Sequence, residues 1–266
     1  MRSILALVRV KWLSFTSYRL NGLFAVIGLI ALLVPLYFVA NALDPVVADS
    51  IANEGGDYFG FLITGMIGMQ LIGTGMRVLP NAVSSGIVSG TLEALLATPA
   101  GLFRLMAGLQ GFDLLWAATR GALLFCGYLV LGGDVSWSGV PMGLVVLALL
   151  VVAHMPVGLL ATAMILVFRT AGPLIQGVAS AVSLLGGVYY STSVIPEVIR
   201  PVADFIPLTY GLRALRRLVL DGAPFSQVAG DVAMLTVMAA GLMAAGIVVV
   251  SASLRYARRA GSLAQY

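Results

Sequence analysis

Charged side chains are scarce in this 266-residue sequence: 10% of its residues are Asp, Glu, Lys or Arg, whereas 60% are hydrophobic. It has a single cysteine, Cys126, so no disulfide can form within the chain. The single histidine, His154, excludes an H-E-x-x-H zinc site. The single lysine, Lys11, has no G-x-x-x-x-G-K-[ST] loop around it, which excludes that kind of nucleotide site. We therefore expect no catalytic residue, metal or cofactor in this chain.

Long apolar runs occupy most of the sequence. A membrane-spanning helix needs about 20 mostly apolar residues, whereas the strands of a membrane barrel are short and alternate in polarity. Five uncharged runs fit the helical requirement, and a sixth is interrupted by Asp113 and Arg120. The sequence therefore predicts an all-α integral membrane fold, with one transmembrane domain over residues 1–266. The six predicted spans are Leu20–Leu43, Tyr58–Met76, Leu105–Leu131, Val135–Phe168, Thr170–Pro196 and Val232–Leu254.

The N-terminal segment, residues 1–20, is basic. It carries four basic residues and lacks a small-residue cleavage site behind a short apolar stretch, so we do not expect a removable signal peptide. Residues Ile4–Tyr18 fit an amphipathic helix that lies on the membrane surface. An ordinary cytoplasmic lead-in fits equally well.

The distribution of arginine predicts the orientation, because Arg and Lys near span ends are retained in the cytoplasm. The loop at residues 41–57 has four acidic residues and no basic one, so we expect it outside. Arg77 and Arg104 predict that the loop between the second and third spans lies inside, and three arginines predict the same for the tail. We therefore expect a multi-pass protein of the cell membrane with both termini in the cytoplasm.

One loop departs from this charge pattern. Residues 195–221 should lie outside, yet they carry four arginines against three acidic residues. Pro196, Pro201 and Pro207 interrupt the segment before an amphipathic run. Irregular backbone at membrane depth must be covered by protein. We therefore interpret residues 195–221 as a re-entrant or amphipathic outer hairpin between the fifth and sixth spans.

A short, partly polar stretch, SGTLEALLATP at Ser89–Pro99, separates two of the apolar runs. Its leucines recur at helical spacing, while Glu93 falls on another face. Pro99 ends the helix because proline has no backbone N–H to donate. The sequence predicts a short cytoplasmic helix at residues 84–98. From the residues alone, a plain interfacial helix and a docking element for a soluble partner both remain open.

The stretch SGTLEALLATPAG is similar to the coupling-helix segment in the permease subunits of type-2 ABC transporters, which include many bacterial exporters. GGVYYSTSVIP and DFIPLTYGLRALRRLVLDG resemble the fifth span and outer hairpin of the same family. The resemblance implies a homodimer, or a pair with a close paralogue, resting on separate ATPase subunits that bind ATP and Mg. Many relatives carry a charged cluster before the Gly-Thr-Leu-Glu core, whereas this sequence has the uncharged SSGIVS. The residues thus implied in ATPase coupling are Ser89, Gly90, Thr91, Leu92, Glu93, Leu95, Leu96 and Pro99.

Two pairs of residues are candidates for a substrate pathway. Asp113 and Arg120 lie two helical turns apart and face the same way. Charges within a membrane usually point inward and pair. Arg120 therefore lines the pathway or attracts an anionic headgroup, or else these residues form a structural ion pair that holds the third span to a neighbour. Tyr189 and Tyr190 form either an aromatic belt at the interface or a stacking surface for substrate. His154 is expected to be a packed, hydrogen-bonded interior residue.

These observations favour the permease subunit of an ATP-driven exporter for a hydrophobic or lipid-like substrate. An ion-gradient-driven secondary transporter is the alternative, but it would need mid-membrane carboxylates and broken helices in both halves. A membrane enzyme would need polar residues clustered at one depth. The arginines are scattered and flank the apolar runs, which indicates membrane lipids as partners and no nucleic acid.

Overall fold

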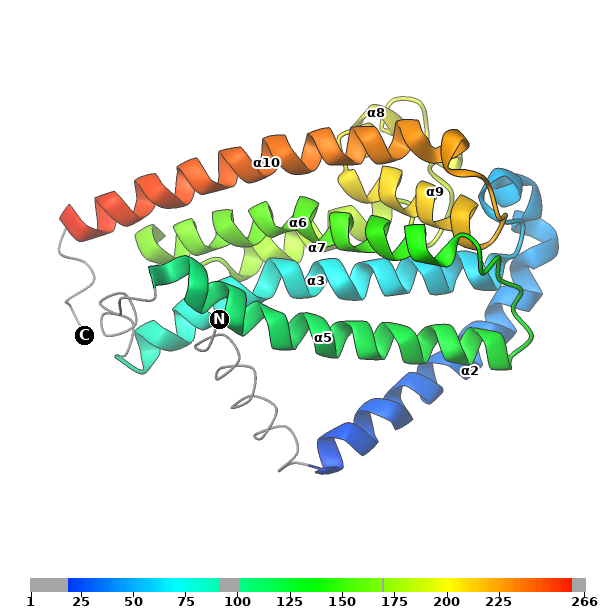
Figure 1. Cartoon of the computed structure of the whole chain (residues 1–266), viewed down its shortest axis with the longest axis horizontal. Helices are drawn as coiled ribbons and strands as arrows, with labels where there is room; N and C mark the ends of the chain where they lie inside the picture. The colour runs from blue at the N-terminus through cyan, green and yellow to red at the C-terminus, as the bar shows by residue number, and fades with distance from the viewer. Residues whose placement is uncertain (1–18, 91–100, 169, 260–266) are drawn as a thin grey trace.

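The computed structural model describes residues 19–90, 101–168 and 170–259, and every regular element in these ranges is helical. Four long helices and a tilted one form the body of the molecule, and short helices fill one end (Figure 1). The elements are α2 (Arg19–Ile51), η1 (Ala52–Glu54), α3 (Tyr58–Val88), α5 (Gly101–Val130), α6 (Val140–Phe168), α7 (Gly172–Leu185), η2 (Thr192–Val194), α8 (Arg200–Asp204), α9 (Pro207–Val219) and α10 (Phe225–Arg259).

The central helix is α3. It contacts α2, α5, α6, α7 and α9, and 72% of its most apolar window is buried, compared with 11% in α2 and 17% in α10. In Figure 1, α10 lies along α6, whereas α2 leans away from the other helices. The outer helices are apolar on exposed faces, as expected where lipid rather than water surrounds the protein.

Five of the described helices are long and apolar enough to cross a membrane, rather than the six that the sequence predicts. The fifth predicted span, Thr170–Pro196, forms a helix only at Gly172–Leu185. Its 14 residues extend about 21 Å at 1.5 Å per residue, which is shorter than a hydrocarbon core of about 30 Å. The helix stops at Gly186 and Gly187, and Gly187 adopts a φ of +81°, a conformation that side chains disfavour.

The chain nevertheless returns along the bundle between α6 and α10. These two helices run in the same direction, so the intervening segment has to travel back from the end of α6 to the start of α10 (Figure 1). Helix α7 covers the first part, and irregular backbone followed by η2, α8 and α9 covers the rest. The predicted outer hairpin, residues 195–221, therefore contains two helices, of which α9 is largely buried against α3, α6 and α10.

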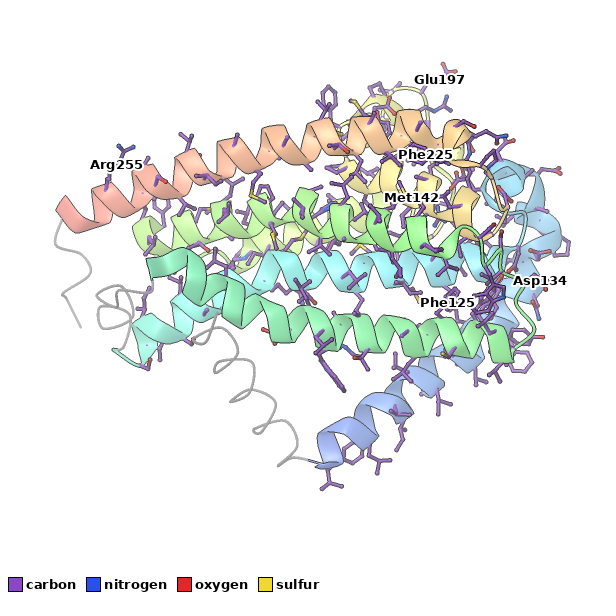
Figure 2. The ribbon with its side chains drawn as sticks, in the orientation of Figure 1. Phe125, Asp134, Met142, Glu197, Phe225 and Arg255 are labelled. Carbon is purple, nitrogen blue, oxygen red and sulfur yellow. The ribbon has the colours of Figure 1, made fainter. Side chains whose placement is uncertain are left out.

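The loops that the charge pattern predicts on one side of the membrane lie at one end of the bundle. We call this the α9 end. Figure 2 shows Asp134, Glu197 and Phe225 at the α9 end, and Arg255 toward the opposite end. The predicted amphipathic helix at residues 1–20 lies outside the described residues, except for Arg19 and Leu20, which begin α2.

Candidate functional site

The predicted coupling segment begins inside α3. The helix expected at residues 84–98 does not start separately, because α3 continues unbroken to Val88. Ser89 then ends α3, with its hydroxyl donating to the Ser85 carbonyl at 2.7 Å, and Gly90 turns the chain at a φ of +66°. A glycine with positive φ is the common way to end a helix. Ser89 and Gly90 are exposed. The remaining coupling residues, Thr91, Leu92, Glu93, Leu95, Leu96 and Pro99, lie outside the described residues.

The four predicted pathway residues do not form one cluster. Asp113 and Arg120 lie partly exposed on α5. The Arg120 guanidinium is 6.0 Å from the ring centroid of Trp116, and its Nε makes no hydrogen bond within the described part of the chain. Tyr189 and Tyr190 instead follow α7, where the Tyr189 carbonyl accepts a bond from the Tyr58 hydroxyl at 3.0 Å.

A buried cluster that the sequence does not reveal lies around Arg216 on α9. Arg216 is 1% exposed, and its Nη1 donates to Glu54 Oε2 at 2.8 Å. Its Nε donates to the Thr64 hydroxyl at 3.2 Å, and its guanidinium lies 3.3 Å from the ring centroid of Phe61. The second Glu54 oxygen accepts from the Ser191 hydroxyl at 2.9 Å. These five residues, the Arg216 cluster, bring together α9, η1, α3 and the segment after α7.

The Arg216 cluster also compensates for the break in α7. Backbone carbonyls in the irregular segment after α7 need hydrogen-bond partners from outside a helix. Arg216 Nη2 donates to the Gly187 carbonyl at 2.9 Å and to the Phe61 carbonyl of α3 at 3.0 Å. A buried polar group without a partner would be costly, so this one guanidinium makes the irregular backbone tolerable inside the bundle.

The other three arginines of the hairpin are also satisfied within the protein. Arg213 pairs with Asp231 at 3.3 Å, and Arg200 donates to the carbonyls of Ser193 and Ile195 at 2.9 and 3.2 Å. Arg217 donates to the Asn53 carbonyl at 3.3 Å. The basic character of residues 195–221 therefore reflects internal contacts. In the sequence, the internal contacts of these arginines were indicated only by the unexpected charge of the loop and by the amphipathic run in α9.

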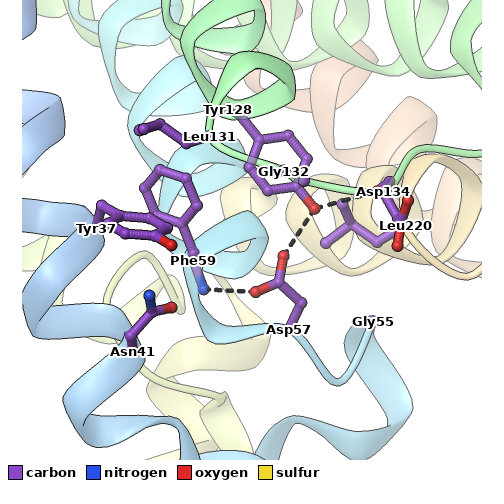
Figure 3. Close-up of a pocket in the computed structure, with 11 residues that line it drawn as sticks. Tyr37, Asn41, Gly55, Asp57, Phe59, Tyr128, Leu131, Gly132, Asp134 and Leu220 are labelled. Atoms are coloured by element: carbon purple, nitrogen blue, oxygen red, sulfur yellow. Dashed lines mark hydrogen bonds between the residues drawn. The ribbon is translucent and has the colours of Figure 1, made fainter.

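A polar pocket of about 340 Å³ lies at the α9 end, where the α2–α3 and α5–α6 connections meet (Figure 3). Asp57 is its central group. Its carboxylate caps α3 by accepting from the backbone N–H groups of Phe59 and Gly60 at 3.0 and 2.9 Å. It also accepts from the Tyr128 hydroxyl at 2.7 Å, which ties the start of α3 to the end of α5.

The second cavity is larger and almost entirely apolar. It measures about 550 Å³ and lies among α3, α5, α6 and α9. Thr64 of the Arg216 cluster is on its wall, as are Leu215 and Val219 of α9. The cavity and the Arg216 cluster therefore share the same stretch of α3 and the same helix at the α9 end.

His154 is a packed interior residue, as predicted. It is 2% exposed, and its Nδ1 lies 2.8 Å from the Leu150 carbonyl one turn earlier in α6. The Leu150 carbonyl accepts only from a protonated nitrogen, so Nδ1 carries the proton. Among the described residues, no group of three or more His, Cys, Asp or Glu side chains is arranged to hold a metal ion.

Comparison with known protein families identifies the chain. The family described as ABC-2 type transporter matches residues 2–220, which include the predicted coupling segment, all helices from α2 to α9 and the Arg216 cluster. A search among curated proteins finds no match to the chain. In this family the permease is a multi-pass membrane protein that lacks ATPase activity, and it generally pairs with a separate ABC ATPase subunit that binds the nucleotide. The chain belongs to the ABC-2 type transporter family, as its membrane permease subunit.

Proposed function

We propose that this permease exports a hydrophobic or lipid-like substrate, as a homodimer or paired with a close paralogue, with both termini in the cytoplasm. The family match carries the proposal, because it extends over the coupling segment and most of the helices. The substrate class is supported by apolar walls: α6 has no charged residue, and the cavity of about 550 Å³ is almost wholly apolar. The export direction follows from the resemblance to exporters.

The central position of α3 supports a route for mechanical coupling. The segment that the ATPase would push, residues 85–97, starts on the last turn of α3 and leads to α5. Because α3 contacts α2, α5, α6, α7 and α9, a displacement of its end reaches every one of them. In this proposal, nucleotide binding closes the ATPase subunits, their motion shifts α3 and α5, and a path opens along the dimer interface.

Glu93→Ala tests the proposed contact with the ATPase. A hydrogen bond to a charged group is worth about 1.5–3 kcal/mol when shielded, so its loss should weaken docking without unfolding the permease. We expect normal membrane insertion, together with less copurified ATPase and lower ATPase activity of the complex in mild detergent. Leu95→Asp should have a larger effect, because it places a charge in the apolar stripe that anchors the helix to its own subunit.

Glu197→Ala is the matched control, because Glu197 is an exposed acidic residue beside α8 at the α9 end. It should leave copurification and ATPase activity at the parental level. Parental activity in both Glu93→Ala and Leu95→Asp would mean that residues 84–98 form a plain interfacial element. If the permease purifies with no ATPase bound, under conditions in which other membrane complexes stay intact, the proposed assembly is contradicted.

A further inference from the structure

The apolar cavity arises because α5 and α6 pack on α3 more than on each other. Both helices have extensive contacts with α3, whereas contacts between α5 and α6 are few. The two helices are consecutive and antiparallel, and Figure 1 shows α3 running between them in this view. The cavity of about 550 Å³ lies between them, within the range of roughly 300–1,000 Å³ that is usual for ligand sites.

Small residues keep this cavity open on both walls. Ala118 and Ala122 lie on its α5 wall, and Ala148 lies on its α6 wall. Larger side chains at these positions would fill the space between the two helices. The cavity therefore depends on small residues at these positions of both helices.

The cavity offers almost nothing for a polar ligand to bind. The hydroxyl of Thr64, a polar group on its wall, already donates to the carbonyls of Gly60 and Phe61 at 2.9 and 3.0 Å. It also accepts from Arg216 at 3.2 Å. A polar occupant would lose its hydrogen bonds to water without replacing them, so the occupant has to be a hydrocarbon.

The cavity is continuous with the lipid-facing surface. Leu144 and Val152 belong to its lining, yet they are 62% and 39% exposed. Both lie on α6, a membrane-spanning helix, so the molecules that reach the mouth of the cavity are the acyl chains of the bilayer. We propose that the cavity holds one acyl chain of a bilayer phospholipid as a bound ligand of the permease.

An aromatic contact fixes the direction in which this lipid binds. Phe125 lines the cavity, and its ring packs edge-on against Trp137, with the ring centroids 6.4 Å apart. Trp137 lies in the α5–α6 connection and is 66% exposed. Exposed tryptophan is typical of the membrane–water interface. The headgroup therefore lies near Trp137 at the α9 end, and the chain extends down between α5 and α6.

Photolabelling of the full-length permease in vesicles tests this proposal. The vesicles contain phosphatidylcholine and a small fraction of phosphatidylcholine with a diazirine on one acyl chain, present throughout reconstitution. After illumination, labelled residues are mapped by mass spectrometry. We expect several-fold more label on residues of the cavity, such as Ala118 and Ala148, than on Val237 of α10, which is 67% exposed to lipid outside the cavity.

Variants that fill the cavity from opposite walls, Ala122→Leu and Ala148→Leu, should each abolish this excess. The control Val237→Leu should leave it unchanged, and a gel-filtration profile matching the parent shows which variants remain folded. Label spread evenly over all lipid-facing residues would overturn the proposal. A second experiment places a cysteine at Ala118 in a Cys126→Ser background. If the cavity takes no label and this cysteine crosslinks to a second copy of the permease, the proposal is also overturned. Neither result bears on the proposed export function, because the measurement uses no ATPase and no transported substrate.

Discussion

Arg216 illustrates how strongly one buried charge depends on its partners. Its guanidinium is 1% exposed and makes contacts with Glu54, Thr64 and two backbone carbonyls. Loss of one member of a buried ion pair leaves the other charge uncompensated, which typically costs about 3–5 kcal/mol. Arg213 is a natural comparison: it lies one turn earlier on α9 but is 31% exposed in its pair with Asp231.

Arg216→Met should therefore lower the unfolding free energy of the permease by about 3–5 kcal/mol, measured by thermal or denaturant unfolding in detergent. Arg213→Met should cost about 0–1 kcal/mol, as is usual for exposed pairs. Glu54→Gln combined with Arg216→Met should recover part of the loss, because no unpaired charge then remains. Equal losses in the two arginine variants would show that the Arg216 cluster does not hold the α9 end together.

At the level of single residues, sequence reasoning succeeded where the local pattern decides the outcome. His154 lies in a continuous apolar run, where a polar side chain is expected to face the protein interior and to bond to the preceding helical turn. The pairing of Arg216 with Glu54 was not predictable in this way, because the two residues are 162 positions apart and meet only through the tertiary fold. Asp113 and Arg120 lie two turns apart on α5, but helical spacing alone does not identify the partners of either side chain.

At the level of elements, the break in α7 decides how the chain returns along the bundle. Hydropathy alone predicts a continuous span at Thr170–Pro196, because GGVYY is itself uncharged and largely apolar. Hydropathy does not register that Gly187 adopts a positive φ or that its carbonyl bonds to Arg216. The five other apolar runs coincide with long helices, and none of these helices has a break like that at Gly187.

If α8 and α9 enter the bundle without crossing the membrane, the chain before Pro196 and the chain after Asp221 lie on the same side. Reporter domains inserted at these two positions should therefore report the same compartment. An insertion at Gly132–Gly133 should report that compartment too, and an insertion at Ser89–Gly90 the opposite one. Opposite reports from the first two positions would mean that α9 contributes another crossing.

For the whole molecule, the placement of charged loops predicts how the permease sits in the membrane. The acidic connection after α2 and the loop with Asp134 share the α9 end, and Arg255 lies toward the other end (Figure 2). This arrangement agrees with the orientation expected from the arginine distribution, which places the α9 end outside the cell. The general layout was predictable from sequence, because composition and charge act along the whole chain.

A cysteine at Asp49 tests this orientation in a Cys126→Ser background. Asp49 is exposed near the end of α2, so the new thiol should react with a membrane-impermeant reagent added outside intact cells. A cysteine at Ala252 of α10, which is also exposed, should react only after the cells are permeabilised. The reverse result would show that the permease is inserted with its α9 end in the cytoplasm.

The long separation between Glu54 and Arg216 has a consequence for the synthesis of the chain. Arg216 follows Glu54 by 162 positions, and translation proceeds at about 5–20 residues per second, so the ribosome takes roughly 8–30 s to reach Arg216 after adding Glu54. The helices α3, α5, α6 and α7 are all synthesised within that interval, before the arginine that pairs with Glu54 exists. The Arg216 cluster therefore cannot form until α9 has been made, and a nascent chain that stalls before α9 lacks the ion-pair partner of Glu54.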